Sequence, residues 1–185
     1  MIKQDLNDSW VIEQHVVTEA ADVEHVRKRI LGLYPQPALF ETRDGFQDVD
    51  GSQTAFMIDL LFEIKLVDDK WYVYGNGPFE MKINECKAVV SDLSKPLFER
   101  LRGVTQILAL PENFPLVLVL AYSAARFVEQ IPEMDVEKGE AEVILRVYRY
   151  VVRYNVAENG AKIDILKSRR DEVTDITNLV LTLMD

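Results

Sequence analysis

The stretch Val143-Ile-Leu-Arg-Val-Tyr-Arg-Tyr-Val-Val-Arg-Tyr154 decides the fold class of this 185-residue chain. Its Val and Tyr content favours a β-strand, because β-branched and aromatic side chains pack well on a pleated sheet. The dipeptide Asn159-Gly160 follows and is typical of a two-residue type I′ turn. A second apolar run, Lys162-Ile-Asp-Ile-Leu166, comes shortly after that dipeptide. The sequence therefore predicts a C-terminal β-hairpin.

Two pentapeptides of the same pattern indicate a second group of strands. Phe62-Glu-Ile-Lys-Leu66 recurs as Phe79-Glu-Met-Lys-Ile83, and Trp71-Tyr-Val-Tyr74 lies between them. Apolar residues alternate with Glu and Lys in both copies, as on a half-buried strand. Residues 67–70 and 75–78 supply the polar and glycine residues that tight turns require. We predict a three-stranded antiparallel meander here.

Helical periodicity predicts elements before and after this meander. A short strand over residues 10–17 precedes a helix that Thr18 opens, and Ser94 caps a second helix. A terminal helix begins after Asp171 and Glu172. The apolar positions expected to face the core in these three helices are Ala20, Val23, Val26 and Ile30, then Leu97, Leu101, Val104 and Leu108, and finally Val173, Ile176, Leu179, Val180 and Leu183.

Two further segments carry weaker patterns. Residues 35–52 are rich in Pro, Gly and Asp, which predicts a long surface connection. Residues 114–131 begin with a run that is apolar on all sides, for which we favour a helix. The alternative is a short buried strand that continues into a helix at Ser123, and periodicity does not separate the two.

Together these elements predict an α+β fold, with an antiparallel sheet, made of the meander and the C-terminal hairpin, packed by helices. We expect residues 1–185 to form a single domain. After the first strand, the expected order of elements resembles the helix, three strands, helix, two strands and helix of small acidic secretion chaperones. The strands here are longer, and a pair of middle helices departs from that plan.

The composition describes a globular, acidic protein. Hydrophobic residues make up 48% of the chain, which is ample material for a core, and the net charge is -10 with a pI near 4.8. Affinity for polyphosphates and anionic lipids comes largely from basic charge, so nucleic-acid coating and membrane-surface binding are disfavoured as main functions.

We expect neither a secretory signal nor a membrane-spanning segment in this sequence. The first residues lack the apolar run of a secretory signal, and the apolar stretch 114–128 is shorter than the roughly 20 residues that span a bilayer. We expect a cytoplasmic protein with no membrane partner. Its single cysteine, Cys86, which we place on a strand, excludes an internal disulfide and a multi-cysteine zinc site.

The Arg and Tyr run is the strongest candidate binding site. Residues 141–170 carry seven Lys or Arg against three Asp or Glu, a charge of +4, whereas the rest of the chain carries -14. On a strand, alternate residues of this run share a face that suits single-stranded nucleic acid or an acidic peptide. On a helix, its arginines form the polar stripe of an amphipathic helix. Even for the strand, the leading interpretation is that the arginines on the sheet pair with the surplus carboxylates of an acidic protein. The candidate residues are Arg146, Tyr148, Arg149, Tyr150, Arg153 and Tyr154.

A metal-dependent nuclease is a second alternative. Restriction-type nucleases combine an acidic residue with a Glu-x-Lys pair on the next strand, and Asp50 or Asp59 with Glu63 and Lys65 matches that pattern. Glu-x-Lys also begins at Glu80 and Glu85, however, as expected on the solvated side of strands.

No other group of residues predicts a metal or cofactor site. The acidic loop that ends at Asp50-Gly51 lacks ligands at the first and last positions of a calcium loop. His15 and His25 lie on different predicted elements without a third ligand. We expect no metal and no cofactor.

The missing catalytic set, the high apolar content and the low pI favour a non-enzymatic binding or interaction module. We expect a chaperone-like or adaptor-like protein that binds a protein partner through an exposed apolar or sheet-edge surface and forms a homodimer. A small-ligand pocket that uses Trp71, Tyr72 and Tyr74 is a further alternative.

Overall fold

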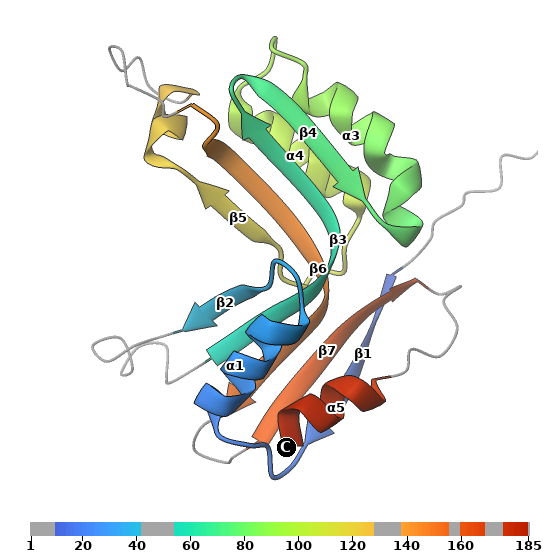
Figure 1. Cartoon of the computed structure of the whole chain (residues 1–185). Helices are drawn as coiled ribbons and strands as arrows, with labels where there is room; N and C mark the ends of the chain where they lie inside the picture. Colours follow the sequence, from blue (N-terminus) through green and yellow to red (C-terminus); the bar gives the residue numbers. More distant parts are fainter. Residues whose placement is uncertain (1–9, 42–53, 128–137, 156–159, 169–175, 185) are drawn as a thin grey trace, which may run out of the picture. The chain divides into compact units, whose positions relative to one another are not determined.

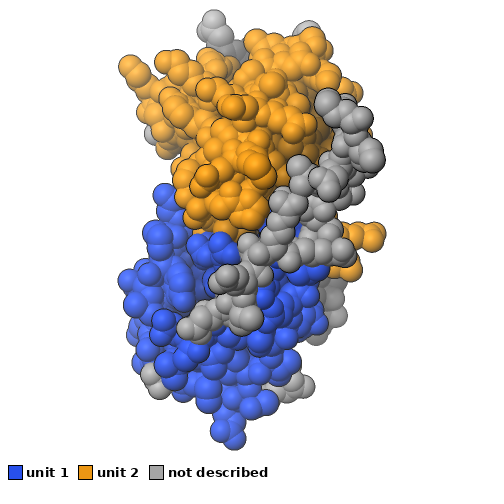
Figure 2. Space-filling view, turned by 90° about the vertical axis from the view of Figure 1, so that its right-hand side faces the viewer, with its two compact units in different colours: residues 1–59, 148–185 blue, residues 60–147 orange. Residues whose placement is uncertain are grey.

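The computed structural model describes residues 10–41, 54–127, 138–155, 160–168 and 176–184. It confirms the α+β class: the described residues form a seven-stranded antiparallel sheet with helices packed against it. By their contacts the residues separate into two compact units, which Figure 2 colours differently. Unit 1 comprises residues 1–59 and 148–185, and unit 2 comprises residues 60–147. The single domain over residues 1–185 stays a prediction.

The strand order is β1-β7-β6-β3-β2, with β4 added to β3 and β5 added to β6 (Figure 1). All strand pairs whose register is given are antiparallel. The strands are β1 (Trp10–Val17), β2 (Ala38–Glu41), β3 (Thr54–Val67), β4 (Lys70–Gly75), β5 (Val117–Leu120), β6 (Ala141–Asn155) and β7 (Gly160–Ser168). The helices are α1 (Val23–Leu33), η1 (Gly77–Lys82), α3 (Ile83–Val90), α4 (Leu97–Leu108), η2 (Tyr122–Phe127) and α5 (Thr177–Met184), of which η1 and η2 are 3₁₀-helices.

The predicted C-terminal hairpin is confirmed as the pair of β6 and β7. Its register runs from Tyr150 opposite Ile165 to Asn155 opposite Gly160. The predicted type I′ turn falls on residues 156–159, which lie outside the described part of the chain. The first strand is also confirmed, with the predicted bounds, as β1.

Unit 1 packs α1 and α5 against the strands β1, β3, β6 and β7. Its core contains Val26 and Ile30 of α1, Leu179 and Leu183 of α5, and Val152 of β6, all at most 3% exposed. Helix α1 begins after Asp22, whose carboxylate accepts a hydrogen bond from the backbone N–H of the second helical residue at 2.9 Å. Asp22 therefore caps this helix, and the prediction that Thr18 opens it is wrong.

Unit 2 packs η1 and α3 against β4, and α4 against α3 and η1. The predicted stripe of α4 is confirmed, because all four of its residues are at most 4% exposed. Phe62 of β3 lies against Phe79 of η1 with ring centroids 5.7 Å apart. The ammonium group of Lys82 donates to the carbonyl oxygens of Ile107 and Leu108 at 2.8 and 2.9 Å, which satisfies the C-terminal end of α4.

The third strand of the predicted meander is wrong. Residues 79–83 form the 3₁₀-helix η1 and the first residue of α3. Pro78 lies in the first turn of η1, where a missing N–H costs nothing, and Phe79, Cys86 and Val90 are all buried. Their spacing of seven and four residues is helical, and it outweighs the alternation within the pentapeptide. Among the described strands, β4 therefore pairs with β3 alone.

Two of the weaker predictions are also corrected. The connection over residues 35–52 contains the strand β2, and its residues 42–53 lie outside the described part. Residues 114–131 do not begin as a helix: β5 is followed by η2, as in the alternative, and β5 is mostly exposed instead of buried. Ser94 does not cap α4, because its side chain donates to Asp92.

No helix in the described ranges is long and apolar enough to cross a membrane.

Candidate functional site

The arginines of β6 are engaged in ion pairs. Arg146 Nε lies 2.6 Å from Glu63 Oε2, and Arg149 Nε lies 2.7 Å from Asp59 Oδ2. Arg153 contacts the buried carboxylate of Asp164 on β7. The run is therefore a strand whose arginines neutralise carboxylates of neighbouring strands, which confirms the pairing expected for an acidic protein.

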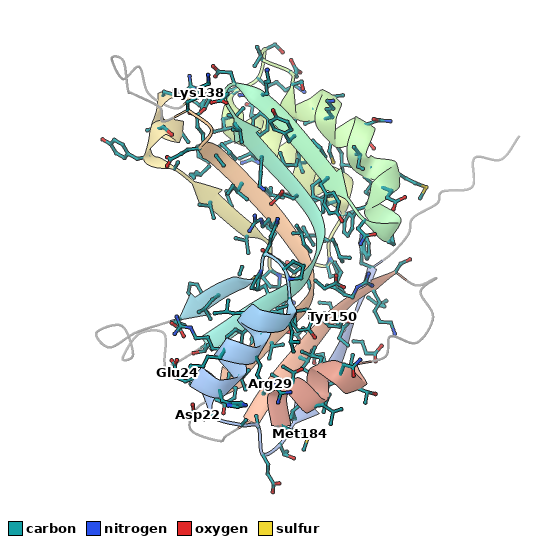
Figure 3. All side chains as sticks on the ribbon, in the orientation of Figure 1. Asp22, Glu24, Arg29, Lys138, Tyr150 and Met184 are labelled. Carbon is teal, nitrogen blue, oxygen red and sulfur yellow. The ribbon has the colours of Figure 1, made fainter. Side chains whose placement is uncertain are left out.

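The tyrosines of the run are largely buried. Tyr148 is 1% exposed and donates its hydroxyl hydrogen to the backbone oxygen of Gln36 at 2.9 Å. Tyr154 is 3% exposed and donates to the backbone oxygen of Ala21. Tyr150, labelled on β6 in Figure 3, packs against the core of unit 1. Because stacking on a base needs an exposed ring face, the buried rings of Tyr148 and Tyr154 are not available for it. The use of the run in binding stays a prediction.

Glu63 is held by two cations and does not line an open acidic site. Its carboxylate oxygens lie 2.6 Å from Arg146 Nε and 2.9 Å from Lys65 Nζ. Within the described ranges no group of three or more His, Cys, Asp or Glu side chains could hold a metal ion, and Asp50 lies outside those ranges. The geometry gives the nuclease alternative no support.

Cys86 lies on α3 and not on the predicted strand. Its side chain is fully buried, and desolvation raises the pKa of the thiol to about 11. A thiol in such a site stays protonated at neutral pH and reacts slowly. The histidines lie where predicted, His15 on β1 beside Glu13 at 2.6 Å and His25 on α1.

Two of the three aromatic residues of β4 are exposed to solvent. Tyr72 and Tyr74 are 55% and 48% exposed, whereas Trp71 faces the guanidinium group of Arg100 at 5.6 Å from its ring centroid. A groove of about 610 Å³ lies on unit 2 between α3 and α4, and its lining contains none of these three aromatic residues. Charged residues dominate this groove, among them Glu99, so it lacks the apolar lining of a typical small-ligand site.

The exposed apolar surface that sequence reasoning missed is the strand β5. Leu118, Val119 and Leu120 are 42%, 49% and 40% exposed, and Tyr122 just beyond them is 83% exposed. Among the described strands, β5 pairs with β6 alone. Figure 1 shows it along the margin of the sheet, beside β6. The apolar run suggested a buried segment, and nothing in its composition distinguishes a buried strand from an exposed one.

The backbone of β5 presents hydrogen-bonding groups along this margin. Ala121 N–H donates to Glu142 O at 2.9 Å, and Leu120 lies opposite Val143. In an antiparallel pair the bonded positions alternate, so the backbone groups of every second residue point away from the partner strand. The N–H and C=O groups of Leu118 and Leu120 therefore point away from β6. We call this margin, with the exposed side chains of residues 118–120, the β5 edge.

An ion-pair network fixes the end of β5. Arg126 of η2 donates to Glu142 through Nε at 2.8 Å and through Nη2 at 2.7 Å, and it also contacts Asp69 at 2.7 Å. These bonds hold the pKa of Arg126 above its usual value. Asp68 accepts a hydrogen bond from the backbone N–H of Gly139 at 2.9 Å. Because Glu142 is 1% exposed, this network ties η2 and the turn between β3 and β4 to a buried position of the sheet.

No family model matches the chain, and no curated protein matches it.

Proposed function

We propose that this protein is a protein-binding module that adds an extended segment of a partner polypeptide to the β5 edge. The single observation that carries the proposal is an exposed, uncharged strand whose outer backbone groups face away from its only described partner strand. An exposed edge of this kind is a template for strand addition. The interaction-module class and the sheet-edge surface agree with the expectation from the sequence.

The β5 edge also lacks the features that prevent unwanted strand addition. Natural edge strands often carry a lysine, an internal proline or a bulge. Residues 114–125 contain no charged residue, and the only proline among them, Pro115, precedes the strand. Only the shortness of β5 limits pairing with an added strand. Leu118 and Leu120 together offer two backbone N–H and two C=O groups, and thus at most four hydrogen bonds. This supports a weak, reversible interaction rather than a permanent one.

The strand geometry gives a variant that removes binding without disturbing β6. Leu118→Pro deletes an N–H that points away from the sheet, a position at which an edge strand tolerates proline. Leu118→Ala is the matched control, because it shortens the same side chain and keeps the N–H. Circular dichroism of both variants checks that the fold is retained.

A labelled peptide tests the proposal directly. An acetylated, amidated peptide Ser-Ser-Val-Leu-Val-Leu-Ser-Ser carrying fluorescein should bind the full chain in fluorescence anisotropy. Leu118→Pro should weaken this binding by about tenfold, because a buried partner carbonyl loses its donor, whereas Leu118→Ala should weaken it less. In the wild-type complex, the amide hydrogens of Leu118 and Leu120 should exchange more slowly with solvent. Equal binding to the wild type and Leu118→Pro would refute the proposal.

The same variant separates a foreign partner from a second copy of the chain. Light scattering at increasing protein concentration reports self-association. A dimer that dissociates in Leu118→Pro would make a second β5 the natural occupant, as the expectation of a homodimer requires. A monomer at all concentrations would assign the edge to a different polypeptide.

A further inference from the structure

We infer that the segment bound at the β5 edge is apolar at successive positions and begins with basic residues, and that it adds antiparallel to β5. This inference rests on the proposed function and names the chemistry of the partner. Successive apolar residues follow from β5 itself. Leu118 and Leu120 share the sheet face of the buried Val143 and Leu145, whereas Val119 lies on the opposite face. An added strand therefore meets an aliphatic neighbour on both of its faces.

The preference for basic residues follows from the charges at the Ala121 end of β5. Hydrogen bonds and ion pairs bring Asp68, Asp69, Arg126 and Glu142 to this end, together with the backbone of Gly139. The chain neighbours of Gly139 are Lys138 and Glu140, and both are exposed. Figure 3 labels Lys138 at the start of β6. Lys70, the chain neighbour of Asp69, is exposed as well, so four carboxylates and three cations leave the described residues of this end with a charge of -1.

The other end of β5 differs in charge. Val117 lies opposite Arg146, whose guanidinium group is paired with Glu63. The acidic end thus distinguishes the two directions in which a strand can be added. In antiparallel addition, the first residues of the segment lie beside Ala121. We favour this direction because all strand pairs of known register in this sheet are antiparallel.

Three peptides with the same apolar centre test the inference. Lys-Lys-Val-Leu-Val-Leu-Ser-Ser places its cations at the acidic end, Ser-Ser-Val-Leu-Val-Leu-Lys-Lys places them at the other end, and Glu-Glu-Val-Leu-Val-Leu-Ser-Ser reverses their sign. The first should bind about fivefold more tightly than the second, since each exposed ion pair contributes little. The third should bind most weakly. Raising the salt concentration should reduce these differences, because added ions screen exposed charges.

A charge variant locates the effect on the protein. Glu140→Gln should reduce the ratio between the first two peptides to about twofold, since one exposed pair is lost. Glu80→Gln makes the same change on η1, which follows β4, and β3 and β6 separate β4 from β5. Because neighbouring strands are about 4.8 Å apart, this control lies well over 10 Å away and should leave the ratio unchanged.

The outcomes separate this inference from the proposed function. Equal affinity of the first two peptides, or tighter binding of the second, would overturn the inference. If that binding were still lost in Leu118→Pro, the β5 edge would remain the binding site. If Leu118→Pro bound all three peptides like the wild type, both the inference and the proposed function would fail.

Discussion

Replacing Arg126 by methionine should destabilise unit 2 strongly. Arg126 holds the carboxylate of Glu142 through two hydrogen bonds, and Glu142 is 1% exposed. Methionine keeps much of the aliphatic stem of the side chain but loses the guanidinium group, which lies over the ring of Phe127 at 4.5 Å from its centroid. The substitution therefore removes the charge while most of the volume remains.

The structure sets the size of the effect. Breaking a buried ion pair by removing one partner costs about 3–5 kcal/mol, because the remaining charge is left without a partner. The side chain of Arg126 is 31% exposed, so water partly replaces it, and we expect the low end of this range, about 3 kcal/mol. For a chain of this length, this corresponds to a fall in melting temperature of about 6–12 °C. The contact with Asp69 adds little, because Asp69 is 75% exposed.

Urea unfolding followed by circular dichroism measures the change in the free energy of unfolding. Asp69→Asn serves as the matched control, with an expected loss below about 1 kcal/mol. The double variant Arg126→Met with Glu142→Met should be more stable than Arg126→Met alone, because it removes the unpaired carboxylate. A loss below 1 kcal/mol in Arg126→Met, or a double variant less stable than both single ones, would contradict this account of the network.

Three further predictions follow from individual residues. The thiol of Cys86, with its pKa raised to about 11 by burial, should not react with Ellman's reagent at pH 8 until urea unfolds the protein, and rapid labelling of the folded protein would contradict its burial. Gly75→Ala should destabilise the protein by about 2 kcal/mol, since its Cβ would lie 2.8 Å from a backbone oxygen of η1. Gly32→Ala, with open space around its Cβ in α1, should instead be neutral or stabilising in the same urea titration. The hydrogen bond from Lys167 lowers the pKa of Glu13 below its usual 4.5. The pair of Glu13 and Lys167 therefore stabilises the folded protein above pH 4.5, and this stability is lost as the pH falls through the lowered pKa of Glu13 in the folded state. Lys167→Met should flatten the loss of stability measured between pH 5 and pH 3, and an unchanged slope would contradict the assignment.

The sequence was sufficient to predict the elements in which local propensity and tertiary packing favour the same secondary structure. The C-terminal hairpin, β1 and the core stripe of α4 were all predicted, because periodicity, propensity and turn residues favour the same structure in each. The pairing of the β6 arginines was also anticipated, since an acidic chain offers many carboxylates to a strand with three guanidinium groups.

The failures occurred where one short pattern fits two structures. Residues 79–83 alternate like a strand, yet the burial of Phe79 with Cys86 and Val90 follows a helical period over a longer window. The apolar run of β5 suits a buried helix, a buried strand or an exposed edge equally well. Which of these forms depends on how many strands lie beyond β6, and that number is a property of the whole sheet.

The basic segment of the sequence, residues 141–170, therefore has a different role in the folded chain than its charge suggested. Its charge of +4 over residues 141–170 suggested a surface for anionic ligands, but Arg146, Arg149 and Arg153 each lie against a carboxylate. Their charge is used to satisfy acidic groups within the sheet, where an unpaired carboxylate would be costly. The strand β5, by contrast, carries no charged residue, and we propose it as the surface that binds another polypeptide. On this proposal, the charge of -1 among the described residues at the Ala121 end of the β5 edge gives the added strand its direction.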